Sequence, residues 1–205
     1  MLSINSVLAI GAHPDDVELG CGATLAKLID RGVHVCAMVM SDGLVGLDGA
    51  ADRCAETMKS FAMLGVTDIV QLRLPDTQLA SHSREMIQAI EAQCARLNPD
   101  RVYTMFADDR HQDHRAVFNA SIVACRSVPQ ILSYETPSSW PNFSPVIFER
   151  SGKFIEKKIL ALQLHKSQAA RSYMRAQQIA CNAQFRGHQV DQGPSEGFMP
   201  YKIVL

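Results

Sequence analysis

The stretch GAHPDDVELGCGAT, residues 11–24, follows a short apolar run at residues 7–10. The apolar run predicts a buried β-strand, and the residues beyond it return to a helix-like pattern. A histidine and two adjacent acids, His13, Asp15 and Asp16, therefore lie where the first strand passes into the first helix. Because that connection needs no such side chains to fold, we infer that they serve chemistry.

Strand-like and helix-like segments alternate along the rest of the chain. Apolar, β-rich runs predict strands at Val7–Ile10, Val33–Met40, Ile69–Leu74, Val102–Phe106 and Ile131–Tyr134. Apolar residues at helical spacing predict helices over Thr24–Arg31, Asp52–Leu64, Ser83–Leu97, Phe154–Leu164 and Gln168–Ala180. A further helix is expected to turn Ala116, Val117, Ala120 and Ala124 inward. Residues 137–145 contain three prolines and predict a loop.

This alternation predicts an α/β fold in one domain, residues 1–205. We expect a Rossmann-like, doubly wound, mostly parallel sheet with helices on both faces. In the strand order 3-2-1-4-5 the first and fourth strands are neighbours, and ligands bind beyond their carboxyl ends. The segment GAHPDD follows the first strand, and a second polar segment, DDRHQDH at residues 108–114, follows the fourth. The two segments should therefore meet in one crevice.

The composition excludes several classes of protein. The formal net charge is −1, and lysine and arginine are scattered, so we expect no nucleic-acid partner. We find neither an apolar run long enough for a transmembrane helix nor the basic start of a signal peptide, and we expect a cytoplasmic protein. The six cysteines form no CxxC pair and are expected to be buried free thiols. Cys21 is the one cysteine near the first polar segment.

The two polar segments together offer a set of metal-binding side chains. Imidazole and carboxylate groups suit a divalent ion such as zinc, and three protein ligands plus water are typical of a catalytic site. A further carboxylate that reaches the water without binding the ion would serve as a general base. Asp15 or Asp16, and Asp109 or Asp113, are also suited to cap the helices that follow them. The candidate residues are His13, Asp15, Asp16, His111, Asp113 and His114.

At these residues the chain resembles the LmbE-like, or PIG-L, family of metal-dependent N-deacetylases. The resemblance rests on Ala12-His13-Pro14-Asp15-Asp16, which matches an AHPDD-type motif, and on His111-Gln112-Asp113-His114, which matches an HPDH-type motif. It extends over nearly the whole chain and is weakest over residues 134–149. Gln112 stands where the family usually has proline, and we expect only a change in loop stiffness. The stretch 134–149, which includes the 137–149 loop, is a candidate for substrate specificity.

The resemblance implies a role for each site residue. His13, Asp16 and His114 would bind Zn²⁺, or another divalent transition metal such as Fe²⁺. Asp15 would act as the general base and His111 would stabilise the oxyanion and protonate the leaving amine. The resemblance also implies that Asp113 orients or tunes His111.

Two further residues are expected to bind the substrate. Arg53 offers a planar fork of donors to a sugar or an anionic group, or else is an exposed helix residue paired with Glu56. Asp42 lies in the segment Ser41-Asp42-Gly43, which also resembles the family.

The function that we predict is hydrolysis of an N-acetyl group from an N-acetylglucosamine-type amino sugar or its conjugate. The partner is then a small-molecule substrate, and a homo-oligomer is compatible with the resemblance. Two alternatives stay open. The first is a metal-dependent amidohydrolase for another N-acyl group, such as formyl, or for a non-sugar amine. The second is a domain that binds a sugar or a nucleotide without turnover.

Overall fold

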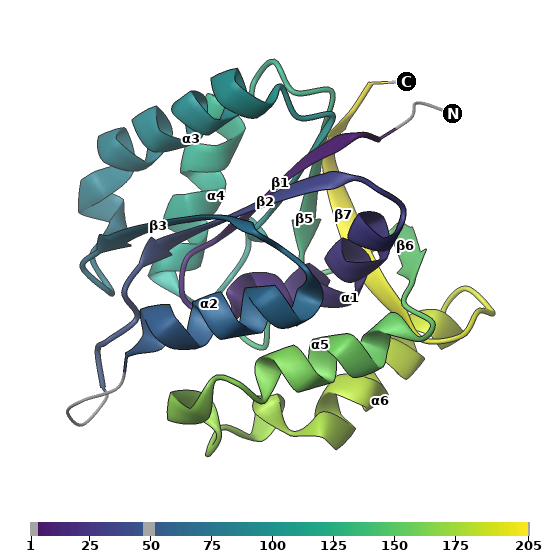
Figure 1. The fold of residues 1–205 in the computed structure, drawn as a ribbon. Coiled ribbons are helices and arrows are strands. Elements are labelled where there is room, and N and C mark those ends of the chain that lie inside the picture. Colours follow the sequence, from purple (N-terminus) through teal and green to yellow (C-terminus); the bar gives the residue numbers. More distant parts are fainter. Residues whose placement is uncertain (1–3, 47–51, 205) are drawn as a thin grey trace.

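The computed structural model describes residues 4–46 and 52–204, which form a seven-stranded sheet with helices on both faces (Figure 1). The strands are β1 (Ser6–Gly11), β2 (His34–Ser41), β3 (Asp68–Leu74), β4 (Arg101–Thr104), β5 (Gln130–Tyr134), β6 (Ile147–Arg150) and β7 (Ser195–Ile203). The α-helices are α1 (Asp16–Asp30), α2 (Arg53–Leu64), α3 (Ser83–Leu97), α4 (Gln112–Ala124), α5 (Phe154–Leu162) and α6 (Ala176–His188). Short 3-10 helices lie at Leu79–His82, Lys166–Gln168 and Ser172–Met174.

The order of the strands creates the predicted crevice. The strands lie in the order β3-β2-β1-β4-β5-β7-β6. Strands β1 to β5 pair in parallel, and β7 pairs antiparallel with β5 and β6. The first five strands confirm the expected order 3-2-1-4-5 and the α/β class. Because β1 and β4 are neighbours, the chain turns to opposite sides of the sheet at their carboxyl ends, and the switch point lies there.

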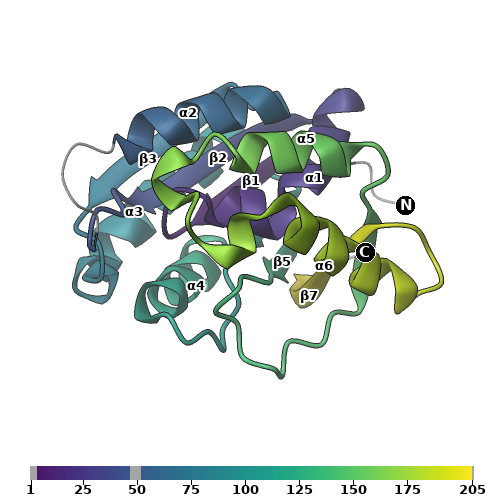
Figure 2. The same cartoon turned by 90° about the horizontal axis from the view of Figure 1, so that it is seen from below.

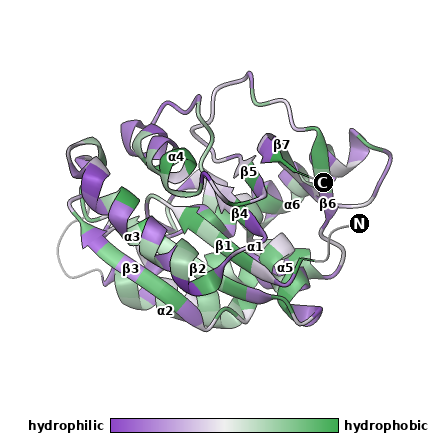
Figure 3. Ribbon diagram, turned by 90° about the horizontal axis from the view of Figure 1, so that it is seen from above, coloured by the Kyte–Doolittle hydropathy of each residue, from purple (hydrophilic) through white to green (hydrophobic). Residues whose placement is uncertain are grey.

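Helices cover both faces of the sheet. Helices α3 and α4 pack together on one face, whereas α1 and α2 cover the other face. Helix α5 lies over α1 and α2, and α6 lies beside α5 and β7 (Figures 1 and 2). The central strands are mainly hydrophobic (Figure 3), and the apolar residues 7–10 of β1 are fully buried, as a strand covered on both faces requires. No helix among the described residues is both long and apolar enough to cross a membrane.

Three helices differ from the expected ranges. Helix α1 begins at Asp16 rather than at Thr24, so Gly20 and Gly22 lie inside it. Helix α5 ends at Leu162, two residues early. The helix expected at Gln168–Ala180 is replaced by 3-10 turns followed by α6, because the extended backbone of Arg171 and Arg175 interrupts the helical path.

Two strands, β6 and β7, were not expected from the sequence. The β7 sequence, SEGFMPYKI, contains glycine and proline, which are depleted in strands. Pro200 pairs with Leu132 where the register between β5 and β7 shifts, and such an irregularity is one of the few places where a sheet accepts proline. The fourth strand also ends at Thr104, two residues before its expected end.

A kink divides α1 and depends on a close contact. Cys21 has non-helical backbone angles (φ −142°, ψ 15°) within the helix. At the neighbouring Gly20, a Cβ atom would lie 2.0 Å from Cδ2 of the fully buried Tyr134 ring. The Tyr134 hydroxyl in turn donates a hydrogen bond to the Ile10 carbonyl at 2.7 Å. Gly20 therefore lets α1 approach β5 and fixes the helix against the sheet.

We predict that Gly20→Ala lowers the free energy of unfolding by about 3 kcal/mol, because the new methyl group must displace the buried ring of Tyr134. Gly22→Ala is the matched control on the same helix, since the nearest atoms to its Cβ lie at 3.4 Å and 3.5 Å. It should change stability by less than about 1 kcal/mol. Urea unfolding of both variants makes the comparison, and equal effects would contradict the role given to Gly20.

Candidate functional site

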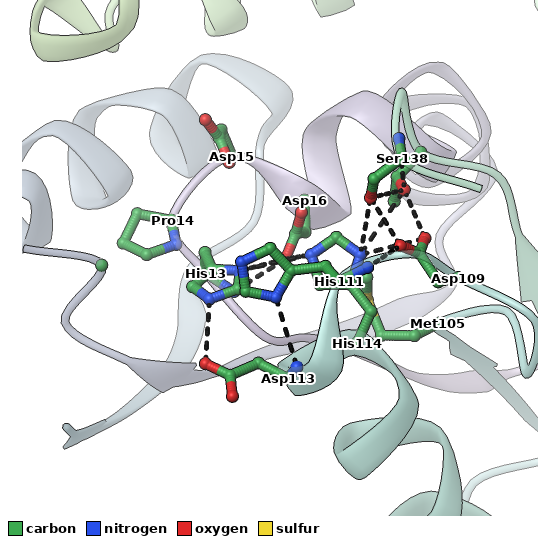
Figure 4. A network of polar contacts seen from close by, with 12 residues as sticks. His13, Pro14, Asp15, Asp16, Met105, Asp109, His111, Asp113, His114 and Ser138 are labelled. Atoms are coloured by element: carbon green, nitrogen blue, oxygen red, sulfur yellow. Dashed lines mark hydrogen bonds and ion pairs between the residues drawn. The ribbon is translucent and has the colours of Figure 1, made fainter. Parts of the chain in front are cut away.

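The two polar segments meet at the switch point, as their positions in the sequence predict. One segment directly follows β1 and runs into the first turn of α1, and the other follows β4 and starts α4. Figure 4 shows the rings of His13, His111 and His114 gathered between the two segments. The ring centroids of His13 and His111 are 4.6 Å apart, and those of His111 and His114 are 4.8 Å apart.

Three ligand atoms form a nearly equilateral triangle. His13 Nδ1 lies 3.3 Å from His114 Nε2 and 3.3 Å from Asp16 Oδ2, and the last two atoms are 3.4 Å apart. All three side chains are buried. A tetrahedral ion with ligands at about 2.1 Å holds neighbouring ligand atoms about 3.4 Å apart. The donor set and its spacing therefore fit a zinc-like divalent ion.

Carboxylates support both histidines of this triangle from behind. His13 Nε2 lies 3.1 Å from Asp76 Oδ1 and 3.3 Å from Asp113 Oδ2, and His114 Nδ1 lies 3.1 Å from Asp109 Oδ2. A carboxylate on the second ring nitrogen is the usual support of a histidine that binds a metal. Asp76 and Asp109 were not identified as site residues from the sequence, although each closely follows the carboxyl end of a strand.

The electrostatics of the triangle favour positive charge. Burial works to lower the pKa of His13, but hydrogen bonds with Asp113, Asp16 and Asp76 outweigh it and raise that pKa well above its usual value. Burial likewise opposes ionisation of Asp16, yet the charge of His114 and the contacts with His13 hold the pKa of Asp16 below its usual range. The carboxylates that favour a protonated His13 would also favour a divalent cation at the triangle.

His13 belongs to two groups of possible ligands. Among the described residues, it clusters with His111 and His114 on one side and with Asp76 and Asp113 on the other. His111 differs from the other two histidines, because its Nδ1 accepts the backbone N–H of Asp113 at 3.2 Å. A neutral His111 ring therefore carries its proton on Nε2. Burial and the nearby charges of His13 and His114 lower its pKa and favour that neutral form.

Asp15 occupies a strained and buried position beside the triangle. Its backbone is left-handed (φ 105°), and its side chain makes no helix-capping hydrogen bond. Strain of this kind is found at functional sites. Burial raises the pKa of Asp15 to about 7, although the Arg53 guanidinium works to lower it. The carboxyl group is thus held near the point of ionisation at neutral pH.

Arg53 is buried, so its interpretation as an exposed helix residue is wrong. Its guanidinium donates to Asp15 Oδ2 at 3.1 Å, to the Gly43 carbonyl at 2.8 Å and to the Pro14 carbonyl. Glu56, the suggested partner, instead accepts the backbone N–H and the hydroxyl of Ser167. Arg53 therefore braces the loop that presents Asp15.

The other sequence candidates fall in different surroundings. The Asp113 carboxylate contacts His13 and accepts the backbone N–H groups of Thr77 and Leu79, so its backbone rather than its carboxylate meets His111. Gln112 is exposed and points away from the triangle to the Thr77 carbonyl. The Asp42 carboxylate accepts the backbone N–H of Leu44, and Asp42 does not line the cavity that opens onto the triangle.

The cysteines take no part in this site. All six are free, and five of them are buried or partly buried, as expected, whereas Cys181 is exposed. Burial raises the pKa of the Cys21 thiol, which donates to the Val17 carbonyl at 3.3 Å. A protonated, buried thiol has little nucleophilic character.

A cavity of about 520 Å³ opens onto the triangle. Asp15, Arg53 and His111 line it together with residues of the loop after β5, Pro137 and Ser138. Part of the stretch 134–149, which was suggested to carry substrate specificity, therefore lines the cavity. The segment before α6 adds lining residues that the sequence did not identify, namely Gln168, Arg171 and Tyr173.

A buried ion pair lies near Asp15. His165 Nε2 is 2.9 Å from Glu18 Oε1, and both side chains are buried. The other carboxylate oxygen of Glu18, Oε2, and the other ring nitrogen of His165, Nδ1, have no hydrogen-bond partner among the described residues. Burial works to lower the pKa of His165, but the Glu18 carboxylate outweighs it and raises that pKa.

We predict that His165→Gln destabilises the fold by about 3 kcal/mol at pH 6, because it leaves Glu18 buried without its charged partner. Since the folded pKa of His165 is raised, its charge-dependent stabilisation is complete below the unfolded pKa of about 6.5 and is lost as the pH rises through the folded value. The loss should therefore be smaller at pH 9 than at pH 6 in denaturant unfolding. A loss that grows with pH would contradict this assignment.

Comparisons with known proteins agree with this geometry. Residues 8–125 match the family PIG-L, described as GlcNAc-PI de-N-acetylase. The chain is 47% identical over 167 residues to the uncharacterized deacetylase YaiS of Escherichia coli, a match that covers 78% of this chain and 90% of that protein. It is 28% identical over 191 residues to the diacetylchitobiose deacetylase of Thermococcus kodakarensis, covering 80% of this chain and 70% of the relative.

A solved structure shows the same fold. The conserved protein TT1542 of Thermus thermophilus superposes with a TM-score of 0.86 at 24% identity, covering 99% of this chain and 97% of that one. Because the family match spans more than half of the chain and the bacterial relative is nearly half identical, the chain belongs to the PIG-L, or LmbE-like, family of deacetylases.

Proposed function

We propose that this chain hydrolyses the N-acetyl group of an N-acetylglucosamine-type amino sugar, with zinc or another divalent transition metal at the triangle. The observation that carries the proposal is the spacing of His13 Nδ1, Asp16 Oδ2 and His114 Nε2, with the unbound carboxyl of Asp15 beside them. Three ligands and a separate base are what metal-assisted hydrolysis of an amide requires.

The protein would hold the metal through His13, Asp16 and His114. When bound there, the ion polarises the amide carbonyl and lowers the pKa of the attacking water. Asp76 and Asp113 would fix the ring of His13, and Asp109 would fix the ring of His114. These carboxylates set which ring nitrogen faces the ion.

Asp15 is proposed as the general base. Arg53 holds Oδ2 at 3.1 Å, whereas Oδ1 accepts no hydrogen bond from the described residues and is left for the proton of the water. Arg53, which was expected to bind substrate, lines the cavity, and its terminal nitrogens donate to Asp15, Gly43 and Pro14, so we propose that it positions Asp15. The substrate-binding role predicted for Asp42 draws no support from this geometry.

His111 is proposed as the donor to the substrate. Its Nδ1 is engaged by the backbone of Asp113, which leaves the Nε2–H group as the donor of a neutral ring. Such a donor stabilises the negative charge that develops on the carbonyl oxygen. A neutral ring that gave up this proton would be left as an imidazolate, so we propose that the proton which Asp15 takes from the water is the one that passes to the leaving amine. Asp113 acts here by fixing the ring through its backbone, while its carboxylate supports His13.

The substrate class rests on the relatives. The family is described as a de-N-acetylase of a GlcNAc conjugate, and the Thermococcus relative is named a deacetylase of diacetylchitobiose. Both names refer to an N-acetylated glucosamine, and we propose the same group for this chain.

We predict that the metal-loaded protein releases primary amine from N-acetylglucosamine derivatives and that Asp15→Asn lowers kcat by at least about 100-fold while metal stays bound. Asp30→Asn, an exposed acid at the far end of α1, is the control and should keep full activity. Chelation should abolish amine release, and readdition of zinc should restore it.

Each arm of this experiment has an outcome that contradicts the proposal. Amine release that continues after chelation would show that the reaction does not need the metal. Full activity of Asp15→Asn would show that Asp15 is not the general base. Stoichiometric metal binding without release from any N-acetylated sugar would favour another acyl substrate or a binding domain.

We predict that Asp109→Asn weakens zinc affinity by about 10- to 100-fold, because His114 loses the carboxylate that orients its ring. The control is Asp108→Asn at the exposed neighbouring residue. The Asp108 carboxylate accepts a hydrogen bond from Asn142 and from no other described side chain, so this variant should leave the zinc affinity unchanged. Competition with a chromogenic chelator measures both variants, and thermal unfolding checks that each is folded. Equal affinities in the two variants would show that Asp109 does not support a ligand.

A further inference from the structure

Two free thiols are in contact at the ends of two packed helices. Cys94 lies in the last turn of α3 and Cys125 directly follows α4, and these two helices pack together on one face of the sheet (Figure 1). The two Sγ atoms are 3.6 Å apart. All six cysteines lie in the described part of the chain, and no other two of them have sulfur atoms in contact.

This pair of thiols is separate from the candidate site. His114 lies in the first turn of α4, whereas Cys125 lies beyond the last turn. At a rise of about 1.5 Å per residue, the two residues are about 16 Å apart along the helix axis. Neither Cys94 nor Cys125 lines the cavity that opens onto the triangle. Chemistry at the two thiols is therefore independent of the proposed hydrolysis.

The two thiols differ in their access to solvent. Cys94 is half-buried and lines a cavity of about 450 Å³ between the ends of α3 and α4. Cys125 is fully buried beneath it and does not line that cavity. A small reagent that enters the cavity therefore meets the sulfur of Cys94 first.

The hydrogen bond between the two thiols makes Cys94 the more reactive one. Donation from the Cys125 thiol lowers the pKa of Cys94, although burial and the carboxylate of Glu91 work to raise it. The same hydrogen bond, together with burial, raises the pKa of Cys125. Because the thiolate is the nucleophilic form of cysteine, Cys94 is the better nucleophile and Cys125 keeps its proton.

The helix ends hold both sulfurs close to bonding distance. The carbonyl of Cys94 accepts the backbone N–H of Asn98 at 2.9 Å, and the N–H of Cys125 donates to the Ser121 carbonyl at 2.8 Å. A disulfide has a sulfur–sulfur distance of about 2.05 Å, so the two atoms would have to approach by about 1.5 Å. An approach of this size is on the scale of a side-chain rotation, and the helices need not separate.

We propose that Cys94 and Cys125 form a reversible oxidation site whose substrate is a hydroperoxide. The sulfur of Cys94 attacks the terminal peroxide oxygen and the O–O bond breaks. This step gives the sulfenic acid of Cys94 and, with the thiol proton on the leaving oxygen, an alcohol or water.

Cys125 completes the reaction by closing a disulfide between the ends of α3 and α4. Its sulfur attacks the sulfenic sulfur of Cys94, the S–O bond breaks, and the hydroxide leaves as water with the proton of Cys125. The two sulfurs together lose two electrons, which reduce the peroxide. A dithiol reductant reverses the oxidation by thiol–disulfide exchange.

The test follows the thiols of the reduced, zinc-loaded protein during treatment with a small excess of hydrogen peroxide. We expect two thiols per chain to disappear and a peptide map to show the Cys94 peptide joined to the Cys125 peptide, lighter by two hydrogen atoms. Dithiothreitol should restore both thiols. Cys181→Ser is the matched control, because it removes the exposed cysteine and should form the same link to the same extent.

Two further variants test the order of the steps. In Cys125→Ser the first step remains but the disulfide cannot close, so the sulfenic acid of Cys94 should accumulate and be captured by dimedone. In Cys94→Ser the remaining thiol of the pair is buried, and its loss should be at least about ten-fold slower than in the wild type. Thermal unfolding checks that both variants fold, and the wild-type peptide map needs no substitution.

Three results would overturn the oxidation site or its order. One is a wild-type peptide map without the link after the Cys94 thiol has been lost, for example with Cys94 present as a sulfinic acid. Another is oxidation of Cys181 while Cys94 and Cys125 both stay reduced. The third is a dimedone label on Cys125 in Cys94→Ser that forms at the wild-type rate of thiol loss.

Discussion

The pairing of β1 with β4 is the constraint on which the site depends. His13 and Asp16 follow one strand and His114 follows the other, separated by about a hundred residues of chain, yet their ligand atoms lie 3.3 to 3.4 Å apart. Only neighbouring parallel strands with adjacent carboxyl ends bring two such segments together. The hydrophobic burial of β1 on both faces holds that arrangement, so the core stabilises the geometry that the chemistry needs.

Burying so many charges requires that each be compensated. The triangle gathers two imidazoles and a carboxylate, all three buried, and further carboxylates lie behind the rings of His13 and His114. Asp15 is held differently, because a single arginine braces one of its oxygens and the backbone is in a left-handed conformation. The side chains of the triangle are thus paired with other charged groups, whereas Oδ1 of Asp15 accepts no hydrogen bond from the described residues, which is the difference expected between metal ligands and a general base.

The order of the first five strands and the meeting of the two polar segments could be predicted from the sequence. The strands and helices follow from local hydrophobic periodicity, and the strand order follows from the general rules for crossover connections. Prediction failed where a distant contact decides the structure. The start of α1 at Asp16 was missed, because the packing of Gly20 on Tyr134 is a contact between residues far apart in the sequence. Pro200 argues against a strand at β7 until the register shift beside Leu132 is known. Arg53 was judged by its place on a helix, whereas its partners, the backbone of Pro14 and Gly43, are loop atoms that no pattern reveals.

The kink of α1 lies between the candidate site, which was predicted from the sequence, and β7, which was not. The first turn of α1 carries Asp16 to the triangle, and beyond Cys21 the freed N–H groups of Ala23 and Thr24 bind Glu196 of β7. The two antiparallel strands thereby anchor the same helix that presents a ligand. A change in β7 or in Lys158, which shares Glu196, should consequently affect the part of α1 beyond Cys21, because a buried carboxylate that loses a partner cannot remain where it is without cost.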